Sequence, residues 1–180
     1  MSARDETYKH IHRVQTLLGI VSDEFRMRAQ NHDKSKLESP EAEVFEEYTP
    51  KLAGCTYGSD EYKGYLEKMK PALDHHYANN SHHPEFYGYY AECNGCFKRF
   101  EQDFIGPCDE CGYTQFQLRP NIGGMSLFDL LEMLVDWKAA TERHNDGNLA
   151  NSIEQNQKRF GYSDETKGFL VNTARELGFL

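Results

Sequence analysis

The sequence predicts an all-α protein with one small zinc ribbon inserted into it. Apolar residues recur at three- and four-residue steps over most of the 180 residues, as they do along the buried face of a helix. Residues 89–120 lack this period and contain four of the five cysteines. The length suits a single hydrophobic core. We therefore predict a helical domain made of residues 1–88 and 121–180, with the ribbon at 89–120.

Net charge and hydropathy argue against several classes of protein. A formal net charge of -9 disfavours a broad basic face for duplex nucleic acid, although metal ions could locally neutralise a small phosphorylated ligand. No apolar run approaches the roughly 18 residues of a transmembrane helix, and the N-terminal segment is charged throughout, unlike a secretory signal. We expect a cytoplasmic protein without a membrane partner. An oligomer is compatible with this composition.

Three helices are predicted before the ribbon. The second begins at Ser39, an expected N-cap followed by proline, and ends near Pro50, because the residue before a proline avoids helical backbone angles. The third begins at Ser59, and Pro71 is expected to kink or restart it. The first helix spans residues 4–29, and its apolar stripe is formed by Tyr8, Ile11, Val14, Leu18, Val21 and Phe25.

Three more helices are predicted after the ribbon. Ser126, with Asp129 three residues later, is close to a capping box, and this helix should run to about Asn145. Two final helices begin at Ser152 and Ser163. Nothing in them suggests chemistry, so we interpret them as packing elements.

Two Cys-x-x-Cys pairs form a strong zinc signal. Eleven residues separate the inner cysteines, and each pair can direct two thiolates toward one point. An intracellular address argues against disulfides. The acidic balance of the ribbon favours a structural or protein-contact role over nucleic-acid binding. We predict one structural zinc, bound by Cys93, Cys96, Cys108 and Cys111.

Four of the eight histidines fall within residues 75–83, where a predicted helix ends. Neutral imidazole is the commonest protein ligand for transition metals, whereas a hydrophobic core has little use for it. A solvated polar turn and histidines that cap a helix end are the two alternatives. The pattern does not decide which member of each adjacent pair would bind. The four are His75, His76, His82 and His83, and we take the last three as candidate ligands.

Further candidate ligands lie elsewhere in the chain. His12 lies beside the apolar stripe of the first helix, where a lone histidine is more often a core or boundary residue. His32 and Asp33 are adjacent in a compact polar segment. Asp136 lies in an apolar stretch of a packing helix, where an acid is costly to bury without a cation. Asp136 is thus either an ion-pair partner or a metal ligand.

These positions resemble the signature of the His-Asp (HD) phosphohydrolase superfamily. His12 matches the histidine of its first helix, His32 and Asp33 match its doublet, and Asp136 matches its distant helical aspartate. Lys36 stands where the superfamily often has a lysine after glycine, with serine here in place of the glycine.

A second resemblance covers almost the whole chain apart from the ribbon. The chain is similar to a family of small helical bacterial and phage proteins known as a domain of unknown function, which lends no activity. The motifs that carry this resemblance are His32-Asp33-x-Ser-Lys with Ser39-Pro40-x-Glu, His75-His76 and His82-His83 with five residues between the two pairs, and Glu132-Met133-x-x-Asp136-Trp137.

The HD resemblance implies an HD-domain-like helical bundle and a metal-dependent phosphohydrolase. Such an enzyme, a phosphatase or phosphodiesterase, would act on a nucleotide or another small phosphorylated molecule through a metal-activated water. Asp33 and Lys36 would be catalytic, and Lys36, Asn80 and Arg143 would contact the substrate. One or two divalent metals, Mn, Fe, Co, Ni or Zn, suit the mixed shell. The implied ligands are His12, His32, Asp33, His76, His82, His83 and Asp136.

Two other functions stay open at this point. One is a di-iron oxygenase, because an inositol-cleaving oxygenase uses the same ordered histidines and aspartates on an HD-type scaffold. The other is a non-catalytic, metal-stabilised module whose ribbon contacts another protein. Stable Mn or Zn would point to hydrolysis, and a redox-active pair of iron ions would point to oxygenation.

Overall fold

The chain is largely helical in the computed structural model, which describes residues 2–56, 59–143 and 147–180. None of the helices within these ranges is long and apolar enough to cross a membrane. The helices are α1 (Ala3–Asn31), α2 (Glu41–Ala53), α3 (Asp60–Asn79), α4 (Leu127–Thr141), α5 (Leu149–Phe160) and α6 (Asp164–Glu176), with short 3₁₀ turns η1 (Lys34–Leu37), η2 (Pro84–Tyr87) and η3 (Ile122–Gly124). The strands are β1 (Tyr89–Cys93), β2 (Arg99–Glu101) and β3 (Phe116–Pro120).

The prediction of an all-α fold is wrong, because the three strands form an antiparallel sheet of order β2-β1-β3. The middle strand pairs Tyr90 with Glu101 on one side and with Arg119 on the other. Aromatic residues and Cys-x-x-Cys turns favour strands over helices in this stretch. Arg119 Nε also donates to Glu92 at 2.6 Å, and its Nη1 donates to the Lys158 carbonyl of α5 at 2.7 Å. The sheet is therefore fastened to the helical part of the molecule.

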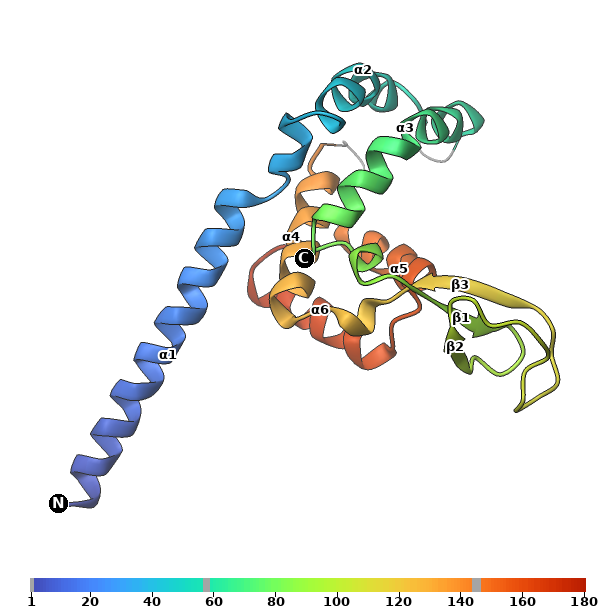
Figure 1. Ribbon diagram of the computed structural model, residues 1–180. Coiled ribbons are helices and arrows are strands. Elements are labelled where there is room, and N and C mark those ends of the chain that lie inside the picture. Colours follow the sequence, from blue (N-terminus) through green and yellow to red (C-terminus); the bar gives the residue numbers. More distant parts are fainter. Residues whose placement is uncertain (1, 57–58, 144–146) are drawn as a thin grey trace.

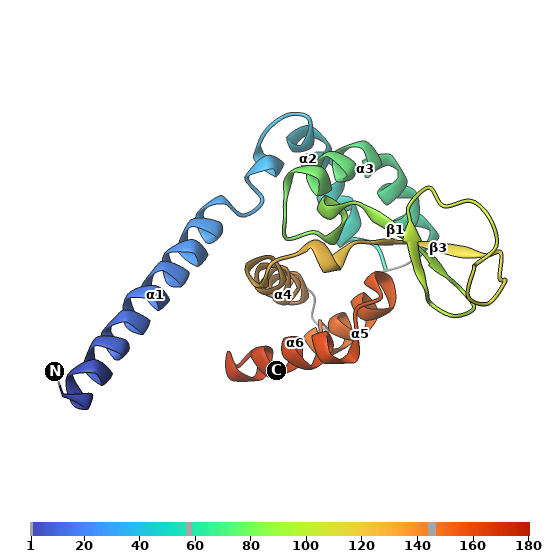
Figure 2. The same ribbon diagram turned by 60° about the horizontal axis from the view of Figure 1, so that its bottom comes forward.

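The hydrophobic core lies between α4, α5 and α6. Met133 and Leu134 face it from α4, and the indole of Trp137 lies parallel to the ring of Phe160 at 6.3 Å. A separate helix pair, α2 and α3, packs side by side above this core (Figures 1 and 2). The buried members of the core are Ile122, Met133, Leu134, Leu149, Ile153, Phe160, Tyr162, Leu170 and Ala174.

Helix α1 projects away from the rest of the molecule as a single straight rod (Figures 1 and 2). Ser2 and Asp5 cap its start reciprocally, and none of its residues, all of which are described, is buried. Its last turns touch α4, where Phe25 packs on Phe128 with ring centroids 4.8 Å apart. The predicted HD-like bundle is therefore wrong as well, because its first helix does not pack along the others.

Pro50 does not end α2 and Pro71 does not restart α3, contrary to the prediction. Pro50 lies inside the last turn of α2, and Pro71 lies inside an uninterrupted α3, next to the buried Met69 and Ala72. Packing of α2 against α3 outweighs the local cost of each proline.

Other predicted helix boundaries differ by a few residues. Pro40 rather than Ser39 occupies the N-cap of α2. Helix α5 begins at Leu149, before Ser152. Helix α4 ends at Thr141, whereas its predicted end at Asn145 lies outside the described residues. Ser59, Ser126 and Ser163 cap α3, α4 and α6, which confirms the predicted starts.

Candidate metal centre

Seven side chains from four parts of the chain converge where α1, α3 and α4 meet. We call them the donor cluster. His32 and Asp33 follow the last turn of α1, His76 lies near the end of α3, and His82 and His83 follow that helix in the next turn. Two acids on α4 complete the set. The cluster comprises His32, Asp33, His76, His82, His83, Glu132 and Asp136.

The first group in the cluster consists of Asp33 and three histidines, with one ligand atom from each lying within 4.8 Å of the others. Asp33 Oδ1 is 3.3 Å from His76 Nε2 and 3.4 Å from His82 Nε2. His76 Nε2 and His83 Nε2 are 3.0 Å apart. Asp33 Oδ1 and His82 Nε2 are buried without a hydrogen-bond partner among the described residues. Buried polar atoms almost always have a partner, so a cation fits between these two.

The second group lies on the other side of Asp33. His32 Nε2 is 3.6 Å from Asp33 Oδ2 and 3.7 Å from Asp136 Oδ1. Glu132 Oε1 is 2.9 Å from His32 Nδ1 and 3.4 Å from His82 Nδ1. The two oxygens of Asp33 therefore face different sets of donors, and either set could hold a cation.

The backbone of Asp33 has a left-handed conformation, with φ 56° and ψ 18°. Aspartate is one of the few residues other than glycine that adopts this region, and such residues concentrate at functional sites. The turn ends α1 at His32, whose N–H donates to the Arg28 carbonyl, and immediately starts η1. The side chains of His32 and Asp33 thereby point into the junction between the helices.

Glu41, at the start of α2, holds His76 in place although sequence reasoning did not select it. Glu41 is fully buried, and its oxygens lie 2.9 Å from His76 Nδ1 and 2.7 Å from His75 Nδ1. Ser35 Oγ donates to the same carboxylate at 3.0 Å. A proton on His76 Nδ1 that is shared with Glu41 leaves the Nε2 lone pair free to face Asp33. His75 therefore contacts Glu41 rather than the donor cluster.

A partly buried ion-pair network fixes Glu132 within the cluster. Arg28 Nη1 donates to Asp129 at 2.8 Å and to Glu132 at 3.0 Å, and its Nε donates to Glu24 at 2.9 Å. Asp129 also accepts from Ser81 and Tyr87, at 2.7 Å each. Glu132 could have been found in the sequence, because it lies one turn before Asp136 on the same line of the helix.

The ionisation of the cluster reflects its burial and its charges. Burial acts to raise the pKa of Asp33, but the close approach of His76 and His82 and the charge of Lys36 hold it well below its usual range. Burial and the neighbouring His82 and His76 lower the pKa of His83 to about 2. Hydrogen bonds with Asp136 and Glu132 raise the pKa of His32 to about 10. The anionic Asp33 and the neutral His83 are in the state that metal binding requires, whereas His32 must release a proton before it can bind a metal.

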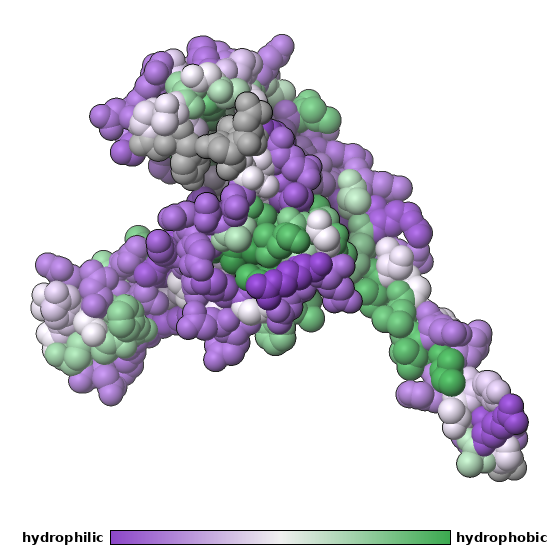
Figure 3. All heavy atoms as spheres, turned by 180° about the vertical axis from the view of Figure 1, so that it is seen from behind, coloured by the Kyte–Doolittle hydropathy of each residue, from purple (hydrophilic) through white to green (hydrophobic). Residues whose placement is uncertain are grey.

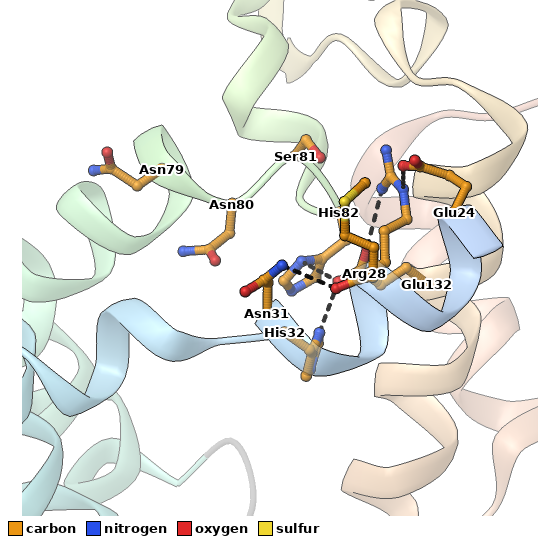
Figure 4. Close-up of a pocket in the computed structure, with 10 residues that line it drawn as sticks. Glu24, Arg28, Asn31, His32, Asn79, Asn80, Ser81, His82 and Glu132 are labelled. Atoms are coloured by element: carbon orange, nitrogen blue, oxygen red, sulfur yellow. Dashed lines mark hydrogen bonds and ion pairs between the residues drawn. The ribbon is translucent and has the colours of Figure 1, made fainter.

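A cavity of about 260 Å³ opens beside the second group. Figure 4 shows the side chains of His32, His82 and Glu132 directed toward one another on its wall. Amide and hydroxyl groups form much of the remaining lining. The lining residues are Glu24, Met27, Arg28, Asn31, His32, Asn79, Asn80, Ser81, His82 and Glu132.

Two predicted site residues lie close to the cluster without being part of it. Lys36 Nζ donates to Asp33 Oδ2 at 2.5 Å and lies 5.1 Å from the centroid of the Phe45 ring. Asn80 donates to Ser35 Oγ and to the His76 carbonyl, at 2.8 Å each, and also lines the cavity.

The structure does not bring His12 or Arg143 to the cluster. His12 is exposed on α1, and the helix rises about 30 Å between it and His32, so the two cannot share a metal within one chain. Arg143 is exposed just beyond the end of α4. The sequence pattern could not exclude either residue. His12 is separated from the cluster by the direction of α1, and Arg143 by its position beyond the end of α4.

The four ribbon cysteines form a second and separate group. Their sulfurs lie within 4.8 Å of one another, with Cys93 and Cys111 at 3.6 Å and Cys96 and Cys108 at 3.5 Å. Sulfurs at the corners of a zinc tetrahedron are about 3.7 Å apart. These cysteines could therefore hold one zinc ion.

Comparison with known proteins adds a family and no activity. Searches of curated proteins and of solved structures gave no match. A family model described as a family of unknown function, DUF5662, matches residues 1–177. Since this match spans nearly the whole length, the chain belongs to the DUF5662 family.

Proposed function

We propose that this protein is a metal-dependent hydrolase of a small phosphate ester, acting as a phosphatase or phosphodiesterase. The observation that carries the proposal is Asp33, whose two carboxylate oxygens face two different sets of nitrogen and oxygen donors. A purely structural metal site is saturated by four ligands. Seven converging donors, two of them with buried and unpartnered atoms, exceed that need.

Divalent cations bound to the cluster would supply an activated water and positive charge, the two requirements of phosphate-ester hydrolysis. The chain itself contributes the geometry. Asp33 bridges the two groups of donors, and Lys36 balances its charge at 2.5 Å. Lys36 is already paired with Asp33, so we assign it first to orienting that carboxylate. We also assign the side of its ammonium group that faces away from Asp33 to contact with a phosphate oxygen.

The cavity beside the cluster supports a small polar substrate. Its volume of about 260 Å³ lies just below the range usual for drug-sized ligands. Asn31, Asn80 and Ser81 line it with groups that donate and accept hydrogen bonds. Arg28 also lines it, but Asp129, Glu132 and Glu24 share its charge. We therefore assign neutralisation of the negative charge of the phosphate group to the bound metals rather than to Arg28.

The sequence resemblance to HD phosphohydrolases supports the same chemistry. The matching positions that lie within reach of one another are His32, Asp33, Lys36 and Asp136. The departure is His12, which lies far along α1. In this chain, His82, His83 and Glu132 supply the additional donors.

The test compares two matched asparagine variants of the full chain. Metal content is measured by elemental analysis. Hydrolysis is screened with added Mn, Co, Ni or Zn, as phosphate release from phosphomonoesters and as release of the leaving alcohol from phosphodiesters. Asp33→Asn keeps the side-chain shape but loses the bridging charge, so metal at the cluster and at least about 1,000-fold of the turnover should disappear. Asp74→Asn, on the exposed side of α3, is the control and should retain both. A cluster that loads metal fully yet hydrolyses neither phosphomonoesters nor phosphodiesters would contradict the proposed hydrolase.

A further inference from the structure

Helix α1 carries an apolar stripe that no other described part of the chain covers. Its residues Ile11, Val14, Leu18 and Val21 are 45, 39, 60 and 38 % exposed. They succeed one another at steps of three and four, so they lie along one face of the helix. Figure 3 shows this face as a band of hydrophobic residues along the projecting rod.

Such a helix needs a partner in order to be stable. An isolated helix gains little from backbone hydrogen bonds alone, and most helical stability in proteins comes from packing of an apolar face. The middle of α1, residues 14–22, contains no charged residue. An uncharged stretch of this kind on an exposed rod is typical of an interface rather than of a solvated surface.

We propose that the stripe of α1 packs against the stripe of a second copy of this chain, with the two helices antiparallel. Alternating steps of three and four produce the seam of a two-stranded coiled coil, which is complementary to a copy of itself. The positions on either side of the seam bring almost no like charges together. These flanking residues are Tyr8, Gln15 and Ser22 on one side and His10, Leu17 and Glu24 on the other.

The stripe also continues into a contact that the chain already makes. Phe25, the next residue of the stripe after Val21, packs on Phe128 of α4 at 4.8 Å. Leu127, at the start of α4, is 81 % exposed and lies next in sequence to this contact. The apolar surface therefore extends from α1 onto the helical part of the molecule, where the start of a partner's α1 can reach it.

The position of the helical core favours the antiparallel arrangement. It lies entirely at the C-terminal end of α1 (Figure 1). Parallel pairing would force two such masses against each other at the same end, whereas antiparallel pairing places them at opposite ends. The first half of each α1 then lies beside the last turns of its partner, which carry the cavity residues Glu24 and Arg28. Helix α1 would thus contribute both to the dimer interface and to the lining of the cavity.

The test uses the full chain and two lysine substitutions on opposite faces of α1. Light scattering after size-exclusion chromatography should give the wild-type protein a mass twice that of the chain. Leu18→Lys places a charge in the seam and should give a single-chain mass, with a dissociation constant raised roughly 100-fold or more. Thr16→Lys adds the same charge on the opposite, exposed face and should remain a dimer. Circular dichroism checks that both variants keep their helices.

Small-angle X-ray scattering of the wild-type dimer tests the orientation. Two helical cores at opposite ends of paired rods should add a second maximum to the pair-distance distribution, near the roughly 44 Å length of α1. A monomeric wild type, a dimer that survives Leu18→Lys, or a compact dimer without that maximum would each overturn the proposal.

Discussion

Glu41 determines which nitrogen of His76 is available to a metal. The buried carboxylate of Glu41 lies 2.9 Å from His76 Nδ1. His76 Nε2 is therefore directed toward Asp33, 3.3 Å away. The same carboxylate contacts His75 and Ser35, so three neighbours share one charge. Burying the Glu41 carboxylate without these partners would be costly. The three contacts therefore constrain the position of the His76 ring in the cluster strongly.

We predict that Glu41→Gln weakens metal binding by roughly 10- to 100-fold, because carboxylates that orient ligating histidines typically contribute that much. Isothermal titration of the metal-free protein with Mn or Zn measures the change. The matched control is Glu43→Gln, two residues later on the exposed face of α2, which should leave the affinity unaltered. An unchanged affinity in Glu41→Gln would remove the orienting role from this carboxylate.

Asp129 stabilises the fold through its charge rather than through a metal. Burial acts to raise its pKa, but hydrogen bonds from Ser126, Tyr87 and Ser81 hold the pKa well below the usual range. A carboxyl with a depressed pKa contributes stability that is present above its unfolded value, about 4, and is lost as the pH falls toward its folded value.

Asp129→Asn should therefore lower the free energy of unfolding by about 1 to 3 kcal/mol at neutral pH. The loss should shrink as the pH falls below about 4, since the unfolded wild-type chain then takes up a proton that the folded protein does not bind. Urea unfolding across this pH series measures both effects. Asp74→Asn, whose exposed ion pair with Lys70 contributes little, serves as the control. A difference between Asp129→Asn and wild type that stayed constant down to pH 2 would count against this assignment.

Residue type indicated donors but not their distances. His32, Asp33 and Asp136 were selected by composition and by resemblance, and they lie together because α1 ends beside α4. His12 was selected in the same way, yet a helix that continues without a turn carries it away. Glu41 has no local feature that separates it from the other acids of α2. Only its burial against His76 reveals its role.

At the scale of elements, local signals determined helix starts better than helix ends. Ser126 and Asp129 form the capping box predicted for α4, because that signal depends on neighbouring residues alone. Pro50 and Pro71 misled the prediction, since contacts between α2 and α3 decide whether a helix continues through them. The strands of the ribbon were missed because three short segments acquire their order only through pairing.

Cys108→Ser tests the ribbon as an independent metal-binding element. Removal of one thiolate from the group of four should release one zinc per chain and destabilise the small sheet, while metal in the donor cluster stays bound. Elemental analysis measures both losses. Cys55→Ser is the matched control, because Cys55 belongs to neither group of donors among the described residues. Zinc retained after Cys108→Ser would exclude a four-cysteine site.

At the scale of the whole molecule, the donor cluster joins segments that lie far apart in the sequence. Residues 32–33, 76–83 and 132–136 meet there, so three helices depend on one point. Each group of donors takes its ligand atoms from more than one of these segments, so a bound cation would tie the segments together. Binding a metal at the cluster should therefore stabilise the tertiary structure, and not only the local loops.

We predict that a divalent metal at 100 times its dissociation constant raises the free energy of unfolding by about 2.7 kcal/mol per bound ion. Thermal unfolding of chelated protein, with Mn added back in steps, measures this as an increase in Tm. Asp33→Asn should abolish the increase, because it removes the carboxylate that faces both groups of donors. Cys108→Ser should preserve it, because the ribbon lies outside the cluster. If Tm rose equally in wild type, Asp33→Asn and Cys108→Ser, Mn would be bound elsewhere. Neither the donor cluster nor the four ribbon cysteines would then be responsible for the increase.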